Sequence, residues 1–147
     1  MIRIDVTDEQ TALAVDAERL RAAVRLILTD AGVQAGMVSI VVVDDPTIHQ
    51  LNREFLEHDY PTDVLSFLLE REGASLEGEV IVSSDTAVRS AEQYGWPAAD
   101  ELLLYVIHGS LHLVGYDDLE PELLAEMRRQ ERHYLGQFGL QPRYDLQ

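Results

Sequence analysis

The spacing of apolar and polar residues changes several times along the chain, and each change predicts a new element. Residues 2–8, IRIDVTD, alternate between apolar and polar side chains, which predicts a β-strand with one buried face. Residues 17–32, AERLRAAVRLILTDAG, have the apolar spacing of an amphipathic helix and end at a glycine. Residues 38–45, VSIVVVDD, form an almost continuous β-branched run, which indicates a strand covered on both faces.

Proline and glycine mark the borders of the other predicted elements. These elements are a helix over 46–56, strands over 62–70 and 78–84, a helix over 85–95, a long apolar helix from Pro97 and an amphipathic helix over 121–139. Their order is typical of an α/β (α+β) sandwich of about four strands with helices around it. The helix after Pro97 is apolar on every side and should be the central buried helix. No repeat or linker divides the chain, so residues 1–147 are expected to form a single domain.

The composition limits the chemistry that this chain can perform. It has no cysteine, so thiolate ligands are excluded and any metal must be held by His, Asp or Glu. All 11 basic residues are arginines, which excludes Schiff-base chemistry and a phosphate-loop lysine. The net charge of −16 argues against non-specific binding of a polyphosphate. An acidic N-terminus and the lack of a membrane-spanning apolar run favour a cytoplasmic protein without a membrane partner.

Two histidines interrupt the long apolar helix. His108 and His112 are four residues apart, so a helix places both imidazoles on one face, one turn apart. Gly115 can end the helix in a left-handed conformation, and Asp118 follows it. The pattern H-x-x-x-H-x-x-G-x-x-D has the spacing of the extended zinc-protease motif, with aspartate as third ligand. It predicts one Zn²⁺ ion, or another divalent cation, whose open coordination position holds the attacking water.

Each of these residues also has a purely structural interpretation. The histidines could be core residues bonded to backbone carbonyls, although two buried imidazoles need polar partners that their apolar neighbours cannot offer. Asp118, or Asp117 beside it, could instead cap the following helix. Gly109 bears on the type of reaction, because zinc proteases carry their general-base glutamate at this position. Hydrolysis of peptides is therefore disfavoured relative to hydrolysis of another substrate.

Three blocks of the sequence resemble those of a known family. The block HGSLHLVGYDD, residues 108–118, resembles the signature H-G-x-L-H-L-x-G-Y-D-H of the YbeY-type endoribonucleases. Residues 51–67, LNREFLEHDYPTDVLSF, and 78–95, GEVIVSSDTAVRSAEQYG, are similar to two further blocks of that family. The resemblance implies a YbeY-like metal-dependent hydrolase domain and a single-strand-specific endoribonuclease, acting in ribosomal RNA maturation and ribosome quality control. It also implies ribosomal RNA and the ribosome or ribosomal proteins as partners, and no DNA.

The resemblance places the family's metal ligands on His108, His112 and Asp118, with Asp118 replacing the usual histidine. As an anion, Asp118 should offset part of the metal's charge and make the bound water less acidic. Leu56 stands where the family usually carries an arginine assigned to the RNA phosphate. The resemblance therefore identifies the metal-bound water as the attacking group and assigns no catalytic side chain. A second family arginine, ahead of Glu101, is also replaced by an acidic residue.

The segment PTDVLSF is expected to form an edge strand beside the metal, since it begins with proline and carries polar residues. Thr62, Asp63 and Ser66 would then bind the substrate. In the alternative interpretation, Asp63 and Ser66 satisfy backbone groups at the end of the strand. His58, just before this strand, is a further candidate for contacting substrate.

Other charged residues are expected on the solvated surface. The last helix carries three arginines on its polar face, where they would pair with nearby glutamates. The residues expected at the surface are Arg128, Arg129, Arg132, Glu126, Glu131, His49 and His133. None of them is assigned to the metal site by the sequence.

The sequence thus supports three functions that differ in chemistry. The first is a zinc-dependent endoribonuclease, with water activated at His108, His112 and Asp118. The second, a metalloprotease, is disfavoured by Gly109, and the third, a non-catalytic ribosome assembly factor, is favoured by Leu56 and the acidic charge. An acidic protein could meet RNA through a local arginine surface and the bound cation, aided by a partner on the ribosome. Alternatively, this chain acts on another substrate.

Overall fold

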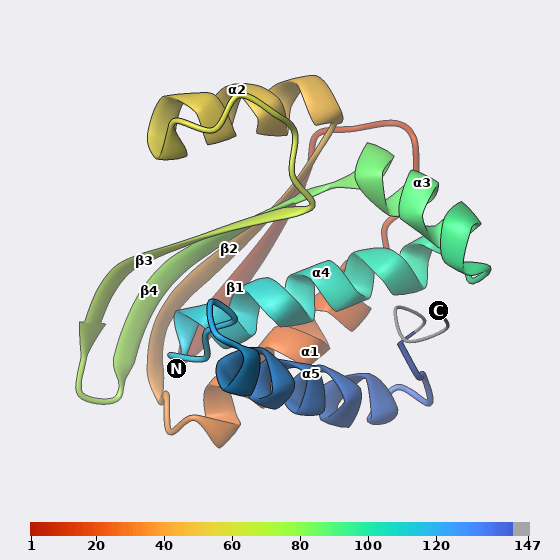
Figure 1. The fold of residues 1–147 in the computed structure, drawn as a ribbon. Coiled ribbons are helices and arrows are strands. Elements are labelled where there is room, and N and C mark those ends of the chain that lie inside the picture. The colour runs from red at the N-terminus through yellow and green to blue at the C-terminus, as the bar shows by residue number, and fades with distance from the viewer. Residues whose placement is uncertain (143–147) are drawn as a thin grey trace.

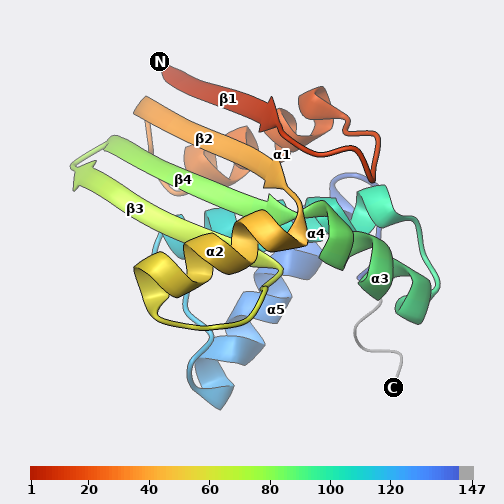
Figure 2. The same cartoon turned by 90° about the horizontal axis from the view of Figure 1, so that it is seen from above.

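A four-stranded sheet forms the framework of the computed structural model, which describes residues 1–142. The strands are β1 (Ile2–Asp8), β2 (Ala35–Val43), β3 (Val64–Glu72) and β4 (Ser75–Ser83), in the spatial order β1-β2-β4-β3 (Figure 1). β1, β2 and β4 are parallel, whereas β3 is antiparallel to β4 and lies at one edge (Figure 2). The segment PTDVLSF was predicted to form an edge strand, and this is confirmed for its last four residues, since β3 begins at Val64.

Helices cover both faces of this sheet. They are α1 (Ala17–Asp30), α2 (Asp45–Leu56), α3 (Ser84–Tyr94), α4 (Ala98–Leu113) and α5 (Pro121–Gly136). α1 and α4 pack against one face and α5 lies on α4, whereas α2 covers the opposite face (Figure 1). α3 continues from β4 and packs along α4. This arrangement confirms the predicted α/β sandwich with a central histidine-bearing helix.

α4 is central because it contacts the sheet, α1, α3 and α5 at once. The larger hydrophobic core lies around it and includes Leu103, Ile107 and Leu111, which are completely buried. A smaller cluster under α2 contains Ile48. β2 contributes to both clusters, as predicted for a strand covered on both faces, but it begins at Ala35, where pairing with β4 starts. Within residues 1–142, no helix combines the length and apolar character needed to cross a membrane.

Gly109 lets α4 approach the sheet closely. A Cβ atom at this position would lie 2.7 Å from Val80 Cγ1 and 2.9 Å from both Val64 Cγ2 and Ser66 Oγ, which is too close for nonbonded atoms. The Ser66 hydroxyl uses this proximity and donates a 2.9 Å hydrogen bond to the Gly109 carbonyl oxygen. The contact fixes the histidine-bearing end of α4 against the edge strand β3.

We expect Gly109→Ala to lower the free energy of unfolding by about 1–3 kcal/mol, because the added methyl group must displace β3 and β4 from α4. Chemical denaturation measures this loss. Gly136→Ala is a matched control, since a Cβ atom at that helical position meets nothing within 4 Å and should be neutral or stabilising. Equal free energies of unfolding for the two variants would contradict the close packing at Gly109.

Asp45 joins the ends of three elements at a distance from the histidines. Its carboxylate accepts hydrogen bonds from Ser83 Oγ (2.6 Å) and Thr86 Oγ1 (2.7 Å), and Arg89 Nη1 pairs with it at 2.5 Å. Burial alone would raise the pKa of Asp45, but these hydrogen bonds and the guanidinium charge outweigh burial and lower the pKa. The ionised carboxylate therefore holds α2, the end of β4 and α3 together.

We expect the stabilisation from Asp45 to depend on pH. Because its pKa is lower in the folded chain, the stabilisation is present above the ordinary value of 3.8 and is lost as the pH falls through the folded pKa. Asp45→Asn should thus lower Tm by several degrees at about pH 7 and much less at about pH 2. Thermal unfolding at both pH values tests this, and an equal loss at both would mean that the charge contributes nothing.

Candidate metal centre

The last turns of α4 carry the two predicted histidine ligands. The Nε2 atoms of His108 and His112 lie 3.1 Å apart, and their rings are nearly perpendicular, with centroids 4.7 Å apart. Both side chains are partly buried. The one-turn spacing therefore brings the two nitrogens together, as the sequence predicts.

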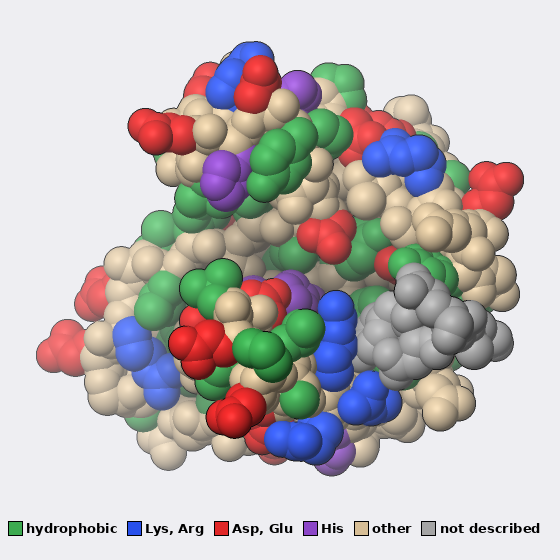
Figure 3. Space-filling model, in the orientation of Figure 1, with side chains coloured by type: hydrophobic (Ala, Val, Ile, Leu, Met, Phe, Trp, Pro, Cys, Tyr) green, Lys and Arg blue, Asp and Glu red, His purple; other side chains and the backbone are tan. Residues whose placement is uncertain are grey.

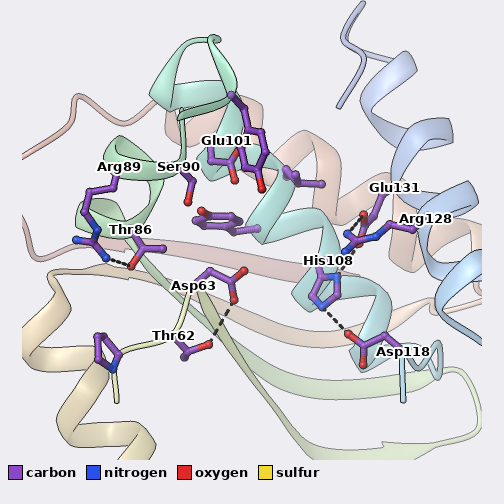
Figure 4. Close-up of a pocket in the computed structure, with 14 residues that line it drawn as sticks. Thr62, Asp63, Thr86, Arg89, Ser90, Glu101, His108, Asp118, Arg128 and Glu131 are labelled. Carbon is purple, nitrogen blue, oxygen red and sulfur yellow. Dashed lines mark hydrogen bonds and ion pairs between the residues drawn. The ribbon is translucent and has the colours of Figure 1, made fainter. Parts of the chain in front are cut away.

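The loop after α4 brings a carboxylate to these histidines. Gly115 adopts φ +107°, a left-handed conformation that turns the chain back past the helix end. Asp118 Oδ2 lies 3.3 Å from His108 Nε2 (Figure 4). The same oxygen lies 3.5 Å from His112 Nε2. Asp118 does not cap α5, whose N-cap lies further along the chain. The backbone N–H of Asp118 instead donates a 2.7 Å hydrogen bond to Asp117 Oδ1, so Asp117 shapes the loop.

The three donor atoms fit a divalent cation. Bonds of about 2.1 Å in a tetrahedral zinc site place neighbouring ligand atoms about 3.4 Å apart. The observed separations of 3.1, 3.3 and 3.5 Å match that spacing, and these atoms all lie within 4.8 Å of one another. Two imidazoles and one carboxylate also leave a coordination position open, as catalytic metal sites do.

A fourth residue, Glu131 of α5, fixes the first histidine. Its carboxylate is completely buried, accepts a 2.6 Å hydrogen bond from His108 Nδ1 and pairs with Arg128 Nη1 at 2.8 Å. Because Nδ1 donates to Glu131, the Nε2 lone pair of His108 faces the triad, as in carboxylate–histidine–zinc arrangements. The prediction that Glu131 lies on a solvated surface was wrong, since its face of α5 packs against α4.

Glu131 and His108 favour each other's charged form. Burial opposes a charge on His108, yet the carboxylates of Glu131, Asp63 and Asp118 raise its pKa. Burial likewise opposes a charge on Glu131, but its bonds to His108 and Arg128 outweigh burial and lower its pKa. A cation at Nε2 competes with a proton there, so cation binding should release a proton and weaken at low pH.

Two hollows meet at this centre. The larger, about 490 Å³, lies between α3, α4, α5 and the start of β3, and the smaller, about 380 Å³, follows β3 itself. Both are lined by Thr62, Asp63, His108 and Asp118. Figure 3 shows the surface hollowed between α2 and α5, with histidine side chains at its floor. An extended substrate can therefore pass from one hollow to the other across the triad.

The structure brings the predicted substrate residues to these hollows. Thr62 and Asp63 line both of them, and Ser66 lines the smaller, although its hydroxyl is already bonded to α4. Leu56, at the position of the expected arginine, also lines the smaller hollow and is 44% exposed. His58 stacks instead on a neighbouring tyrosine ring, and it is not among the described residues that line either hollow.

Sequence reasoning missed the far walls of the larger hollow. Glu101 and Tyr105 line it from the same face of α4 as His108, and burial raises the pKa of Glu101. Their helical spacing was a signal available in the sequence. Arg89 and Arg128 line the hollow from α3 and α5. No sequence pattern indicates the position of these two arginines, because that position depends on how the helices pack.

We expect Asp118→Ala to weaken binding of a divalent cation by more than about 100-fold, because it removes a ligand oxygen, whereas Asp117→Ala should weaken it less than about 10-fold. Asp118→His should keep the fold, still bind zinc and shift any metal-dependent activity to lower pH, since a neutral ligand leaves the bound water more acidic. Calorimetric titration with Zn²⁺ and a pH profile measure these effects. Loss of binding in Asp117→Ala alone would show that the ligand is misassigned by one residue.

Comparisons with known proteins find relatives that cover most of the chain. The profile of the family described as Endoribonuclease YbeY matches residues 5–139. The Endoribonuclease YbeY of Rhodopirellula baltica is 48% identical over 112 residues, which cover 75% of this chain and 58% of that protein. That of Salinibacter ruber is 36% identical over 141 residues, with 90% of each chain covered. The solution structure of TM1509 from Thermotoga maritima superposes with a TM-score of 0.62 at 28% identity, covering 95% of this chain and 92% of that one.

Proposed function

The chain belongs to the YbeY endoribonuclease family, and on this premise we propose that it is a single-strand-specific, zinc-dependent endoribonuclease. We propose further that it works in the cytoplasm on ribosomal RNA, in ribosomal RNA maturation and ribosome quality control, with the ribosome or ribosomal proteins as partners. One observation carries the proposal. The triad of His108, His112 and Asp118 lies beside an edge strand where two hollows meet.

The residues around the triad have distinct tasks in this proposal. When bound, a divalent cation supplies a Lewis acid that activates water and polarises a phosphodiester. His108 and His112 present Nε2 to it, and Glu131 holds the His108 ring in the required tautomer.

The segment just before the edge strand offers contacts for the RNA. The Thr62 hydroxyl can donate to a phosphate oxygen, and the Asp63 carboxylate can accept from a ribose hydroxyl or a base N–H. Because the triad side chains are partly buried and line two hollows, the site admits a flexible single strand more readily than a rigid duplex.

One residue bears on each of the two alternative functions: Gly109 on the metalloprotease and Leu56 on the assembly factor. A metalloprotease would need a glutamate at position 109, but Gly109 faces the tightly packed sheet, where no side chain fits. A non-catalytic assembly factor is favoured by Leu56, because no arginine is among the described residues that line the smaller hollow. The intact triad and its buried carboxylate favour the enzyme over this second candidate, because an assembly factor has no need of them.

The proposed function can be tested with purified protein, a structured ribosomal RNA fragment and a denatured protein substrate, each with and without a chelator. We expect cleavage of single-stranded segments of the RNA alone, lost with chelator and restored most efficiently by Zn²⁺ among the divalent cations. Cleavage of the protein substrate alone would overturn the proposal. Inactivity on both substrates, whatever the cation, would identify a non-catalytic factor.

A further inference from the structure

A site that cleaves RNA must neutralise charge on the phosphodiester, and this chain has few groups for that task. It has no lysine and a net charge of −16. In the smaller hollow the side chain beside the histidines is that of Leu56, which is apolar. Among the described residues that line the two hollows, the arginines are Arg89 and Arg128. Neutralisation by a permanently charged side chain therefore falls to these two arginines.

Arg128 lies next to the triad. Its Nη1 pairs with Glu131 Oε1 at 2.8 Å, and Glu131 Oε2 accepts the 2.6 Å hydrogen bond from His108 Nδ1. A single carboxylate thus separates the guanidinium from the first metal ligand. Figure 4 shows Arg128 on the same side of the cavity as His108 and Asp118. Its side chain is 36% exposed, and a guanidinium presents five N–H donors in a planar fork that suits phosphate oxygens.

Arg89 stands on another wall of the same cavity. It belongs to α3, pairs with Asp45 and lies beside Thr86, away from the triad in Figure 4. Of the two arginines, Arg128 is therefore the nearer to a phosphate at the triad. Arg89 could contact a phosphate further along the RNA. Of the two arginines, Arg128 is the one that can act on the reacting group.

We propose that Arg128 of α5 contacts the scissile phosphate from the larger hollow and stabilises the charge that develops there during cleavage. This inference rests on the proposed endoribonuclease function and adds a catalytic side chain to it. The fixed position of the guanidinium supports this role, because Glu131 is buried and is itself anchored by His108. Preorganised cationic groups of this kind are effective because they need no rearrangement in the transition state.

The test compares Arg128→Ala with Arg129→Ala in cleavage of a single-stranded RNA oligonucleotide. Arg129, the next residue of α5, is well exposed and pairs with Glu126 at 2.8 Å. Its replacement by alanine therefore removes the same charge at a different place. We expect kcat/KM to fall about 100-fold in Arg128→Ala and less than about threefold in Arg129→Ala. Equal values for the two variants would overturn the inference.

A second set of measurements separates phosphate contact from positioning of His108 through Glu131. Binding of the same oligonucleotide to metal-free protein should weaken in Arg128→Ala. The slope of log affinity against log salt concentration is negative, and it should become less steep by about 0.7. Zn²⁺ affinity should stay within about threefold, because the three ligands remain. A large loss of Zn²⁺ affinity with unchanged RNA binding would show that Arg128 acts only as a positioning residue, and would overturn the inference.

A rescue experiment uses the neighbouring hollow. Leu56→Arg in the Arg128→Ala background places a guanidinium beside His108 and His112 from the other side, and should restore kcat/KM at least about tenfold. Absence of any rescue, together with unchanged RNA binding in Arg128→Ala, would count against a phosphate contact. If unmodified protein cleaves no RNA, the proposed function fails, whereas the binding comparison still decides whether Arg128 contacts phosphate.

Discussion

Replacement of His112 by alanine is expected to reduce RNA cleavage by at least about 1000-fold while the fold remains intact. The His112 side chain is partly exposed, so its loss leaves no deeply buried group without a partner. The change removes one of three protein ligands, and one imidazole with one carboxylate binds a divalent cation only weakly. Elemental analysis of the purified variant should therefore find far less than the roughly one cation per chain expected of the unmodified protein.

The matched control for this change is His133→Ala. His133 is an exposed residue of α5 whose ring contacts Tyr134 edge-to-face, and its loss should leave cation content and RNA cleavage unchanged. Because a ligand that binds only the native state raises stability, a chelator should lower Tm of the unmodified protein and of His133→Ala, but not of His112→Ala. A His112→Ala protein that retains one cation per chain and full activity would disprove the triad.

Glu131→Ala is expected to lower the free energy of unfolding by about 3–5 kcal/mol and the cation affinity by about 10–100-fold. The completely buried carboxylate binds both His108 and Arg128, so its removal leaves the His108 Nδ1–H without an acceptor and breaks the ion pair with Arg128. The cavity left by the side chain adds to this cost. Chemical denaturation and calorimetric titration with Zn²⁺ measure the two effects separately.

Two further variants identify the cause of the loss at Glu131. Glu131→Gln keeps the shape and an acceptor oxygen, so it should recover part of the stability while cation affinity remains about tenfold reduced. Glu126 lies on the same helix, and its carboxylate pairs with exposed Arg129. Glu126→Gln should therefore lower the free energy of unfolding by less than about 0.5 kcal/mol. If Glu131→Ala were no more destabilising than Glu126→Gln, the buried ion pair would contribute nothing to the fold.

The order and type of the elements could be predicted from the sequence because they follow from local periodicity. The strand pattern of residues 2–8 and the all-round apolarity of α4 report directly which faces are buried. Boundaries were less accurate, since the pairing of β2 with β4 begins at Ala35, before the apolar run starts. The strands that pair lie far apart in the sequence, so the local pattern of apolar residues does not indicate where their pairing begins.

The grouping of the three candidate ligands could also be predicted, because it depends on residues close together in the sequence. Four residues of helix set the separation of His108 and His112, and one glycine-terminated turn returns Asp118 to them. The same helix geometry would have identified Glu101 and Tyr105 as neighbours in the larger hollow. Such relations are fixed by covalent geometry and hydrogen bonding within a short segment.

The surroundings of the triad were decided only by tertiary packing. Gly109 was interpreted through the absence of a catalytic glutamate, whereas its packed environment against β3 and β4 is what excludes a side chain there. Glu131 appeared to be a surface partner of Arg128, although its spacing from Met127 and Leu135 places it on the buried face of α5. A charged residue on such a face is tolerated only where another element supplies a partner, and α4 supplies His108. The sequence by itself determined that His108, His112 and Asp118 come together, while the docking of α5 onto α4 decided that Glu131 and Arg128 lie beside them.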